Sequence, residues 1–332
     1  MKLIVQIPAY NEEATIADVV CGIPRSISGV DRVEVLVIND GSIDQTVERA
    51  RKAGADHILS LPYNRGLAFG FQAGLDACLR QAADIIVNTD GDNQYPGEQI
   101  PQLIEPILRG QADIVIGDRQ IDQVRHFSVR KRLLERFGSW VVRLVSSTTV
   151  PDAPSGFRAY SREAALRLFV TSDFSYTLDN LIQAGKRGLK VAHIPILTNP
   201  TRPSKLHRGS WHFIKRQGST IVRAYATYEP LKTFFYLSLP FWLVALLLFA
   251  RLFIIFLRQD FALPGNVQSL IIAVMALIVG FLVMIFGLLA DRIGDTRRLM
   301  EEMLYRQRRD ELARLAQDQV NQQPHEEADR PA

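Results

Sequence analysis

Two aspartates, Asp90 and Asp92, stand one residue apart in the stretch NTDGDNQYPG, just after an apolar run that ends at Val87. Carboxylates held this close repel each other unless a cation lies between them or one takes up a proton. Hard divalent cations such as Mg²⁺ and Mn²⁺ accept one or two protein carboxylates and fill their other positions with water and substrate phosphates. An EF-hand loop starting at Asp90 is excluded, because Tyr95 stands where that loop needs glycine and Pro101 where it needs glutamate. The pair therefore indicates a divalent-metal site that suits a nucleoside diphosphate.

The elements that position this pair are predicted to form a mainly parallel sheet with helices on both faces, because β-rich runs alternate with helical patterns along the chain. The six predicted strands are Leu3–Ile7, Val33–Ile38, His57–Leu61, Ile85–Val87, Asp113–Ile116 and Val191–Ile196. In such sheets ligands bind beyond the carboxyl ends of the strands. Polar residues follow four of these runs, namely Tyr10 and Glu12, Asp40, Asp90, and Arg119. One Asp-Gly after a strand is usually only a turn, whereas four such strand ends predict a site at this edge.

Two apolar runs near the C-terminus are each close to the length that crosses the hydrocarbon core of a bilayer. They are Phe234–Leu257, which contains the single charged residue Arg251, and Val267–Ala290. The connection between them is short and contains Pro264 and Gly265. We therefore expect a hairpin of two transmembrane helices over about 234–257 and 267–290.

Basic residues flank this hairpin on the side of both chain ends. They are Lys232, Arg292, Arg297, Arg298, Arg306, Arg308 and Arg309. By the positive-inside rule, residues 1–230 and the tail are expected in the cytoplasm, so that both termini are cytoplasmic. The only cysteines, Cys21 and Cys78, are predicted to be small core residues of a reduced compartment, without a disulfide or a metal.

The formal net charge is +4, and basic residues gather between positions 125 and 143 and between positions 202 and 216. No nucleic-acid motif accompanies these two clusters, so the expected partner is an anionic lipid bilayer and not nucleic acid. Residues 128–146 are predicted to form an amphipathic helix, which suits either the membrane interface or an ordinary domain surface. A charged helix from Asp295 to about Ala316 is expected to precede a polar, disordered end.

Six motifs occur in the order seen in family 2 glycosyltransferases with the GT-A fold. They are IPAYNEE, VINDGSIDQT, NRGLAFGFQAG, NTDGDNQYPG, SGFRAYSRE and RPSKL. Over residues 1–230 the sequence resembles the polyprenyl-phosphate sugar transferases of this family, typified by dolichyl-phosphate mannose synthase. The resemblance implies a metal-dependent, inverting hexosyltransferase that uses Mg²⁺ or Mn²⁺. It also implies a nucleotide sugar as donor and a polyprenyl phosphate as acceptor, on the cytoplasmic face of the membrane.

The fold class expected on these grounds is α/β. It comprises a GT-A type, mainly parallel sheet flanked by helices, then a two-helix transmembrane hairpin and a C-terminal cytoplasmic helix. The expected domains are a glycosyltransferase domain over 1–210, an interfacial amphipathic connector over 211–232, the transmembrane pair within 233–291, and a charged helical tail with a disordered end over 292–332.

The resemblance also assigns roles to residues at matching positions. Contacts with the nucleotide sugar are implied for Pro8, Tyr10 and Glu12, at the base and ribose, and for Asp40 and Asp90. The metal on the diphosphate would be held by Asp90 and Asp92, with Gln94 beside them. Acceptor-phosphate ligands are implied at Arg130, Lys131 and Ser204.

Four catalytic residues are implied in the same way, namely Asp152, Arg119, Arg202 and Lys205. The three cations would offset the charge that builds on the departing diphosphate. Asp152 would be a general base against a hydroxyl acceptor, whereas a phosphate acceptor is already ionised near neutral pH and leaves Asp152 to orient the acceptor or the metal. The chain departs from the family pattern at Asp118, where a small residue is usual, and around Pro203, where Gly-Glu usually precedes Ser-Lys.

Two other functions stay open from the sequence. A transferase that extends a lipid-linked or polymeric glycan would share the fold, but the Gln-x-x-Arg-Trp signature of processive synthases is absent. A non-catalytic membrane scaffold would keep the nucleotide fold, but the intact Asp90, Asp92, Arg119 and Lys205 argue against it. The sugar, the choice between UDP and GDP, and the oligomeric state, including a homo-oligomer, are not determined by the sequence.

Overall fold

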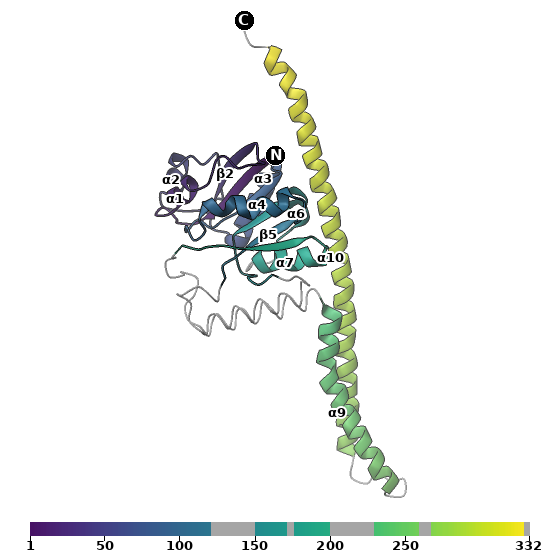
Figure 1. Ribbon diagram of the computed structural model, residues 1–332. Helices are drawn as coiled ribbons and strands as arrows, with labels where there is room; N and C mark the ends of the chain where they lie inside the picture. Colours follow the sequence, from purple (N-terminus) through teal and green to yellow (C-terminus); the bar gives the residue numbers. More distant parts are fainter. Residues whose placement is uncertain (121–149, 171–175, 200–228, 259–266, 329–332) are drawn as a thin grey trace. The chain divides into compact units, whose positions relative to one another are not determined.

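The structure, a computed structural model, describes residues 1–120, 150–170, 176–199, 229–258 and 267–328 (Figure 1). The chain forms two compact units, Met1–Gly218 together with Glu301–Ala332, and Ser219–Met300. The predicted amphipathic helix at 128–146 and most of the predicted connector at 211–232 lie outside the described residues.

The described residues of the first unit contain a seven-stranded sheet. Its strands are β1 (Lys2–Ala9), β2 (Arg32–Asn39), β3 (His57–Ser60), β4 (Ile85–Asn88), β5 (Ile114–Asp118), β6 (Arg158–Ser161) and β7 (Val191–Pro195). Their order across the sheet is β3-β2-β1-β4-β6-β5-β7. β1 is parallel to β2 and β4, β2 to β3 and β5 to β7, whereas β6 is antiparallel to both β4 and β5. The mainly parallel sheet predicted from the sequence is confirmed, and each predicted strand is present.

Strand β6 is the element that the sequence does not predict. It is only four residues long and lies inside the motif SGFRAYSRE, where so short a run shows no clear alternation. Because β6 is antiparallel to its neighbours, its first residue lies where β4 ends, as the pairing of Asn88 with Arg158 shows. The segment just before Arg158 is thereby brought to the carboxyl edge of the sheet.

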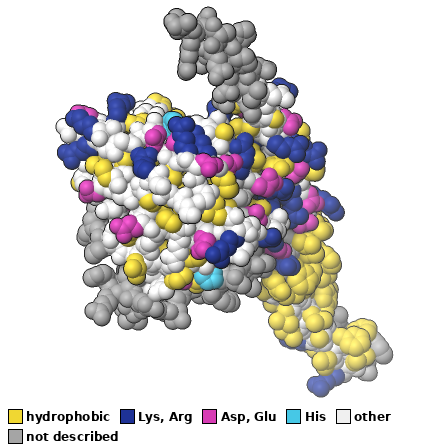
Figure 2. Space-filling view, turned by 45° about the horizontal axis from the view of Figure 1, so that its top comes forward, with side chains coloured by type: hydrophobic (Ala, Val, Ile, Leu, Met, Phe, Trp, Pro, Cys, Tyr) yellow, Lys and Arg dark blue, Asp and Glu magenta, His cyan; other side chains and the backbone are white. Residues whose placement is uncertain are grey.

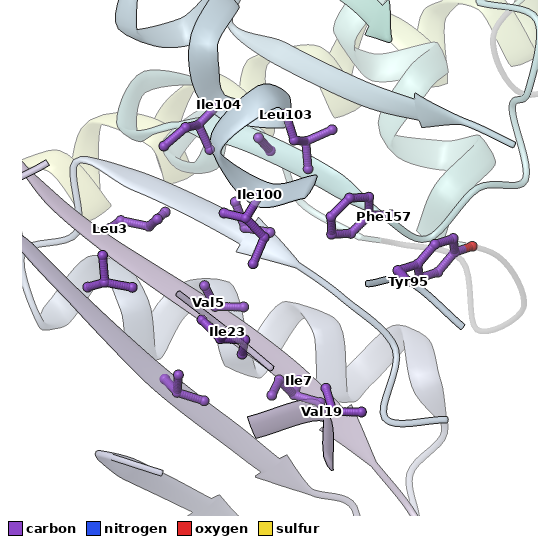
Figure 3. Close-up of a cluster of buried hydrophobic side chains, with 14 of the residues drawn as sticks. Leu3, Val5, Ile7, Val19, Ile23, Tyr95, Ile100, Leu103, Ile104 and Phe157 are labelled. Atoms are coloured by element: carbon purple, nitrogen blue, oxygen red, sulfur yellow. The ribbon is translucent and has the colours of Figure 1, made fainter. Parts of the chain in front are cut away.

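Helices cover both faces of the sheet (Figure 1). They are α1 (Ile16–Cys21), α2 (Thr46–Lys52), α3 (Leu67–Arg80), the 3₁₀ turn η1 (Gly97–Gln99), α4 (Ile100–Leu108), α6 (Arg162–Arg167) and α7 (Tyr176–Lys186). On one face, Leu3, Val5 and Ile7 of β1 lie in an apolar cluster with residues of α1 and α4, as Figure 3 shows. On the other face, Ile4 belongs to a second cluster that includes Phe71 of α3. Successive residues of β1 are thus buried on opposite faces, as expected for a parallel strand covered on both sides.

The two cysteines differ in their surroundings. Cys78 of α3 is buried, as predicted, but Cys21 is exposed, so its predicted place in the core is wrong. Cys21 is the last residue of a helix of only six residues, whose buried side chains are Ile16, Val19 and Val20. One residue beyond Val20 the helix has turned by about 100°, which carries the Cys21 side chain away from the core.

The second unit contains two helical segments that are long and apolar enough to cross a membrane, within α9 (Pro230–Arg258) and α10 (Val267–Ala328). They are Pro230–Arg258 and Val267–Leu315, and they contain the two predicted spans, about 234–257 and 267–290. Trp242 of α9 packs directly over Gly280, and its ring lies 5.6 Å from that of Phe281 between centroids. Phe234 likewise fills the space over Gly287. Glycines let the two helices approach closely, which is common in transmembrane pairs.

Helix α10 continues to Ala328, whereas the sequence predicts a helix to about Ala316 and then a disordered end. The surface of the two apolar helical segments consists mainly of exposed hydrophobic side chains. Further along α10, the exposed side chains are a mixture of Lys, Arg, Asp and Glu (Figure 2).

From Glu301 onward α10 belongs to the first unit and packs against it. Glu301 forms an ion pair with Arg187 at 2.7 Å, and Arg308 forms one with Asp76 at 2.9 Å. Leu312 is buried in the second apolar cluster. This part of the tail is therefore an element of the folded domain, which its thin apolar stripe alone does not reveal.

Candidate active site

Residues that follow four parallel strands lie at one edge of the sheet. β1, β2, β4 and β5 run in the same direction, so Tyr10, Asp40, Asp90 and Arg119 come just after their carboxyl ends. The antiparallel β6 adds the segment before its first residue, which contains Asp152. The structure thus brings together predicted site residues from five separate segments of the chain.

The loops after β1 and β2 are joined by hydrogen bonds. The N–H of Asn11 donates to Oγ of Ser42 at 3.0 Å, and the N–H of Ile43 donates to Oδ1 of Asn11 at 3.0 Å. Asn11 has a φ of 53°, a left-handed conformation that asparagine tolerates better than most residues. These bonds fix the loop that carries the exposed Tyr10 and the half-buried Glu12.

Asp40, directly after β2, organises the loop before α3. Its carboxylate accepts hydrogen bonds from the backbone N–H groups of Arg65 at 2.7 Å and Gly66 at 2.9 Å. Gly41 follows with a φ of 73°, and a Cβ there would lie 2.6 Å from the carbonyl carbon of Tyr63, so only glycine fits. Asp40 therefore shapes the predicted nucleotide pocket by fixing one of its loops.

Asp90 and Asp92 lie on a turn that packs against the end of β1. Between them, Gly91 approaches β1 so closely that a Cβ there would lie 3.3 Å from the carbonyl oxygen of the buried Pro8. The carbonyl of Gly91 accepts a hydrogen bond from Oγ1 of Thr15 at 2.7 Å. The turn is thus held against the first loop of the site.

The negative charge of Asp90 is not balanced by the described part of the protein. Burial first, and then the charge of Asp92, raise the pKa of Asp90 to about 7, whereas Arg119 acts in the opposite direction. From the described residues, neither a hydrogen bond nor an ion pair reaches the Asp90 carboxylate. Within the same residues, the buried hydroxyls of Thr89 and Ser155 also have no hydrogen-bond partner. Such a site favours a ligand that brings positive charge.

The oxygen donors at this turn fit a divalent cation that is shared with a substrate. Within the described ranges, no group of three or more Asp, Glu, His or Cys side chains could hold a metal. Two carboxylates are, however, the usual protein share of a Mg²⁺ site that substrate phosphates complete. Asp90 and Asp92 therefore suit a metal that binds together with a diphosphate.

The segment after β7 clamps the turn that carries the aspartates. The N–H of Gln94 donates to Oδ1 of Asp92 at 3.1 Å. The N–H of Asn199 donates to the carbonyl of Gln94 at 2.9 Å, and Nδ2 of Asn199 donates to the carbonyl of Asn93 at 3.0 Å. Asn199 was not among the predicted site residues, although its place shortly after a predicted strand is the same signal that marks Asp40.

Asp152 and Arg119 form a buried ion pair with two parallel hydrogen bonds. Nε of Arg119 donates to Oδ2 of Asp152 at 2.7 Å, and Nη2 donates to Oδ1 at 2.8 Å. The backbone N–H of Arg119 donates to Oδ2 as well, at 3.1 Å. Asp118, which replaces a small residue of the family pattern, accepts the N–H of Gln120 at 2.9 Å and stabilises a turn in which Gln120 has a φ of 49°. Asp118 therefore supports the turn that directs Arg119 to Asp152.

Arg158 is a buried residue whose role the sequence does not reveal. Its guanidinium donates to the carbonyls of Ser155 at 2.8 Å, Ala153 at 2.6 Å and Thr177 at 2.8 Å. These bonds fix the segment between Asp152 and β6, and they satisfy the charge of a fully buried side chain. The arginine of the SGFRAY motif was visible in the sequence, but its partners are backbone groups that no sequence pattern marks.

Five predicted site residues lie outside the described residues. They are Arg130, Lys131, Arg202, Ser204 and Lys205. Their predicted roles at the acceptor phosphate and the leaving group therefore remain predictions.

Comparison with known proteins places the chain in a family. The family model described as "Glycosyl transferase family 2" matches residues 4–169, which contain the loops after β1, β2, β4 and β5 and extend just past α6. The chain belongs to glycosyl transferase family 2. The predicted resemblance is thereby confirmed for the family, and the carboxyl edge of the sheet is the candidate active site of a glycosyltransferase.

Relatives of this family 2 glycosyltransferase include enzymes named for polyprenyl phosphates. The dolichyl-phosphate hexose transferase of Haloferax volcanii is 33% identical over 194 residues, which are 58% of this chain and 81% of the relative. The polyprenol monophosphomannose synthase of Mycolicibacterium smegmatis is 28% identical over 206 residues, 59% of this chain and 76% of the relative.

A solved structure shares the fold. Glucosyl-3-phosphoglycerate synthase from Mycobacterium tuberculosis, in complex with Mn²⁺ and UDP-glucose, aligns with a TM-score of 0.51 and 25% identity. The alignment covers 68% of this chain and 78% of that structure. Together with the sheet order, this likeness confirms the predicted α/β fold of GT-A type.

Proposed function

We propose that this glycosyltransferase moves one sugar from a nucleotide sugar, linked to UDP or GDP, to a polyprenyl phosphate on the cytoplasmic face of a membrane. The observation that carries the proposal is the close pair Asp90 and Asp92 at the carboxyl edge of the sheet, in which the buried Asp90 has no hydrogen bond or ion pair from the described residues; such a pair suits a metal-bound diphosphate. The relatives named for dolichyl phosphate and polyprenol monophosphomannose support the acceptor.

Donor binding is assigned to the first half of the site. Asp90 and Asp92, with Gln94 beside them, would hold Mg²⁺ or Mn²⁺. Bound there, the ion would neutralise negative charge on the donor diphosphate. The M. tuberculosis structure of the same fold contains Mn²⁺ and UDP-glucose, which supports this choice. The base and ribose would lie against Pro8, Tyr10, Glu12 and the loop that Asp40 fixes.

The reaction is a single in-line displacement with inversion at the anomeric carbon. An oxygen of the acceptor phosphate forms a bond to that carbon while the bond from the carbon to the donor diphosphate breaks. The nucleoside diphosphate leaves with the electron pair. Because the acceptor phosphate is already ionised near neutral pH, the step needs no general base.

Asp152 is a positioning residue in this mechanism. Both of its oxygens accept hydrogen bonds from Arg119, and its side chain is fully buried. A carboxylate in a bidentate pair with arginine is fixed in place, with both oxygens already occupied by N–H donors. Asp152 would therefore hold Arg119 toward the phosphates, where the guanidinium offsets charge on the leaving diphosphate.

The remaining charge would be offset by residues of the segments 130–131 and 202–205, which lie outside the described residues. Arg202 and Lys205 are assigned to the leaving diphosphate, and Ser204, Arg130 and Lys131 to the acceptor phosphate. Arginine binds phosphate through two parallel hydrogen bonds and lysine as a point charge, so this mixture suits two phosphate groups in one site.

The contacts of the tail support a transmembrane hairpin. Arg308 pairs with Asp76, and Glu301 pairs with Arg187, so residues from before α9 and after the second span lie in one folded unit. A chain that crosses a bilayer twice returns to the side from which it started. The basic residues next to the spans then favour the cytoplasm for this unit.

The test is an assay of lipid products. Detergent-purified protein is incubated with Mn²⁺ or Mg²⁺, a polyprenyl phosphate and a panel of UDP- and GDP-sugars, and the lipid extract is analysed by mass spectrometry. The native protein is expected to make a glycosyl-phosphoryl-polyprenol, and Asp92→Ala is expected to make none.

Other outcomes would correct the proposal. Metal-dependent release of UDP or GDP without a lipid product would keep the transferase and overturn the acceptor, which would favour a glycan acceptor. No turnover of any donor by a protein shown to be folded would overturn the enzyme and favour a scaffold.

A further inference from the structure

A chain of buried polar side chains runs through the centre of the sheet to Asp90. Asn88, the last residue of β4, is fully buried, and so is Gln6 of β1. Nε2 of Gln6 donates to Oδ1 of Asn88 at 3.0 Å. Nδ2 of Asn88 donates to the carbonyl of Gly156 at 2.9 Å and to Oη of Tyr176 at 3.1 Å. Apolar residues could fill the same space without any need for hydrogen-bond partners, so this network calls for a reason other than burial.

Gly156 is the point where this network meets the carboxylate. A Cβ at position 156 would lie 3.0 Å from each carboxylate oxygen of Asp90 and 3.1 Å from Oη of Tyr176. The Asp90 carboxylate therefore packs directly on the backbone of Gly156, beside the Tyr176 hydroxyl. Since no hydrogen bond from the described residues holds Asp90, this packing surface decides where its oxygens lie.

The packing surface is itself fixed from several directions. The N–H of Gly156 donates to Oη of Tyr95 at 3.3 Å, so both peptide groups of Gly156 are held, one by Tyr95 and one by Asn88. The ring of Tyr95 stacks on Phe157 at 5.2 Å between centroids. The ring of Tyr176 stacks on Phe71 at 4.2 Å. Little freedom is left for this surface to move.

We propose that Asn88 and Tyr176 are positioning residues that fix the Asp90 carboxylate for donor and metal binding, and that position 156 must be glycine to leave room for it. They act through Asp90 and do not touch the substrate. The inference rests on the proposed role of Asp90 at the donor diphosphate. It extends the site inward, from the carboxyl edge into the core of the sheet.

The first test compares two buried tyrosines. Tyr176→Phe removes one hydroxyl and keeps the ring on Phe71. Its matched control is Tyr160→Phe, because Tyr160 is buried near Phe71 and its hydroxyl likewise takes part in hydrogen bonds, with Asn180 at 3.3 Å and with the Arg158 side chain. Tyr160 pairs with Ile86 and so lies further from the edge than Asn88.

Binding of Mn²⁺ to the full-length protein is measured by electron paramagnetic resonance in the presence of UDP, and kcat and the KM for the lipid acceptor are measured separately. Tyr176→Phe is expected to weaken Mn²⁺ binding by about 10-fold, the lower end of the range for removing an outer group that supports a metal ligand. The acceptor KM is expected to stay unchanged. Tyr160→Phe is expected to match the native protein in Mn²⁺ binding.

Gly156→Ala provides a second, independent variant, since its methyl group must displace the Asp90 carboxylate. It is expected to weaken Mn²⁺ binding at least as much as Tyr176→Phe. Equal Mn²⁺ binding by the native protein, Tyr176→Phe and Gly156→Ala would overturn the inference. An equal loss in Tyr176→Phe and Tyr160→Phe would overturn it too, because a general effect on the core would then suffice. If the native protein binds Mn²⁺ and UDP but makes no glycolipid, the proposed function fails while this comparison still decides the positioning role.

Discussion

Two buried carboxylates at opposite edges of the same sheet have opposite surroundings. Glu34 lies near the amino end of β2 and forms ion pairs with Lys2 at 2.8 Å and with Arg32, and a hydrogen bond with His57 at 2.8 Å. Burial alone would raise the pKa of Glu34, but hydrogen bonds from Lys2 and His57 outweigh it and lower the pKa. Asp90, beyond the carboxyl end of β4, has its pKa raised to about 7 by burial and by Asp92.

The difference between these two carboxylates separates a structural role from a functional one. The protein balances the charge of Glu34 with its own side chains, so this carboxylate contributes to stability and needs nothing else. No described residue forms an ion pair with Asp90, so its charge suits a ligand that balances it; the burial costs stability in the free protein and is recovered on binding. In this fold, a buried carboxylate without an ion-pair partner among the described residues lies at the candidate site, whereas a buried carboxylate with several partners lies in the structural part of the sheet.

The largest expected effect is that of Asp90→Asn, which should lower turnover by about 1,000-fold and yet stabilise the metal-free protein. The folded pKa of about 7 lies above the unfolded value of about 3.9. Ionisation of Asp90 therefore removes stability as the pH rises from about 4 to about 7, and the variant escapes this loss. Thermal denaturation at pH 8 without metal should show a higher melting temperature for the variant, and a lower one would contradict the comparison.

Asp152 is an intermediate case, a buried carboxylate at the functional edge that one arginine satisfies. Asp152→Asn should lower kcat by about 100-fold, because Arg119 loses its bidentate partner and its fixed direction. Raising the pH should not restore activity. Recovery of turnover at high pH would instead assign Asp152 as a general base.

Glu34→Gln tests whether the paired carboxylate of Glu34 contributes to stability and not to turnover. It should lower the free energy of unfolding of the first unit by about 2 kcal/mol, the usual scale for hydrogen bonds to a charged group. Turnover per folded molecule should match the native protein. Because the folded pKa of Glu34 is lowered, its stabilising contribution is present above the unfolded value of about 4.3 and is lost as the pH falls through the folded pKa. Melting temperatures of the native protein and of Glu34→Gln should differ at neutral pH and converge at acid pH.

The smallest expected effect is on the tail. Arg308→Ala should destabilise the first unit by about 1 kcal/mol, because Arg308 pairs with Asp76, donates to the carbonyl of Leu168 and lies over the ring of Phe169. Arg309→Ala is the matched control, since Arg309 is exposed, its ion pair with the neighbouring Asp310 is 3.8 Å long, and its guanidinium lies 5.9 Å from the ring of Tyr305. Equal melting temperatures for the two variants would show that the packed tail contributes no stability.

Much of the fold and of the candidate site could be predicted from the sequence. The long strands β1 and β2 carry runs of β-branched and aliphatic residues, and the polar residues that end them are local signals that need no knowledge of the fold. The same holds for the two spans, whose length and composition suffice. The pair Asp90 and Asp92 could be interpreted because like charges at this spacing are unfavourable without a cation.

The features that the sequence did not predict share one physical cause, which is that they depend on contacts or ends of elements that no local residue pattern marks. Strand β6 is defined by β4 and β5 on either side of it, and Arg158 by carbonyls of the segment around it and of α7. The exposure of Cys21 depends on where a six-residue helix ends. The packing of the tail depends on ion pairs such as that of Arg187 with Glu301, more than a hundred positions apart.

The sequence by itself determined the family, the parallel strands, the acidic pair and the two spans, because each is written in the types and spacing of neighbouring residues. Only the tertiary structure decided that Asp152 pairs with Arg119, that Asp40 holds the loop before α3 and that Asn88 and Tyr176 meet at Gly156. Those contacts join residues from separate segments, and the contacts at Asp152 and Gly156 also depend on the antiparallel β6, which brings the segment before Arg158 to this edge of the sheet.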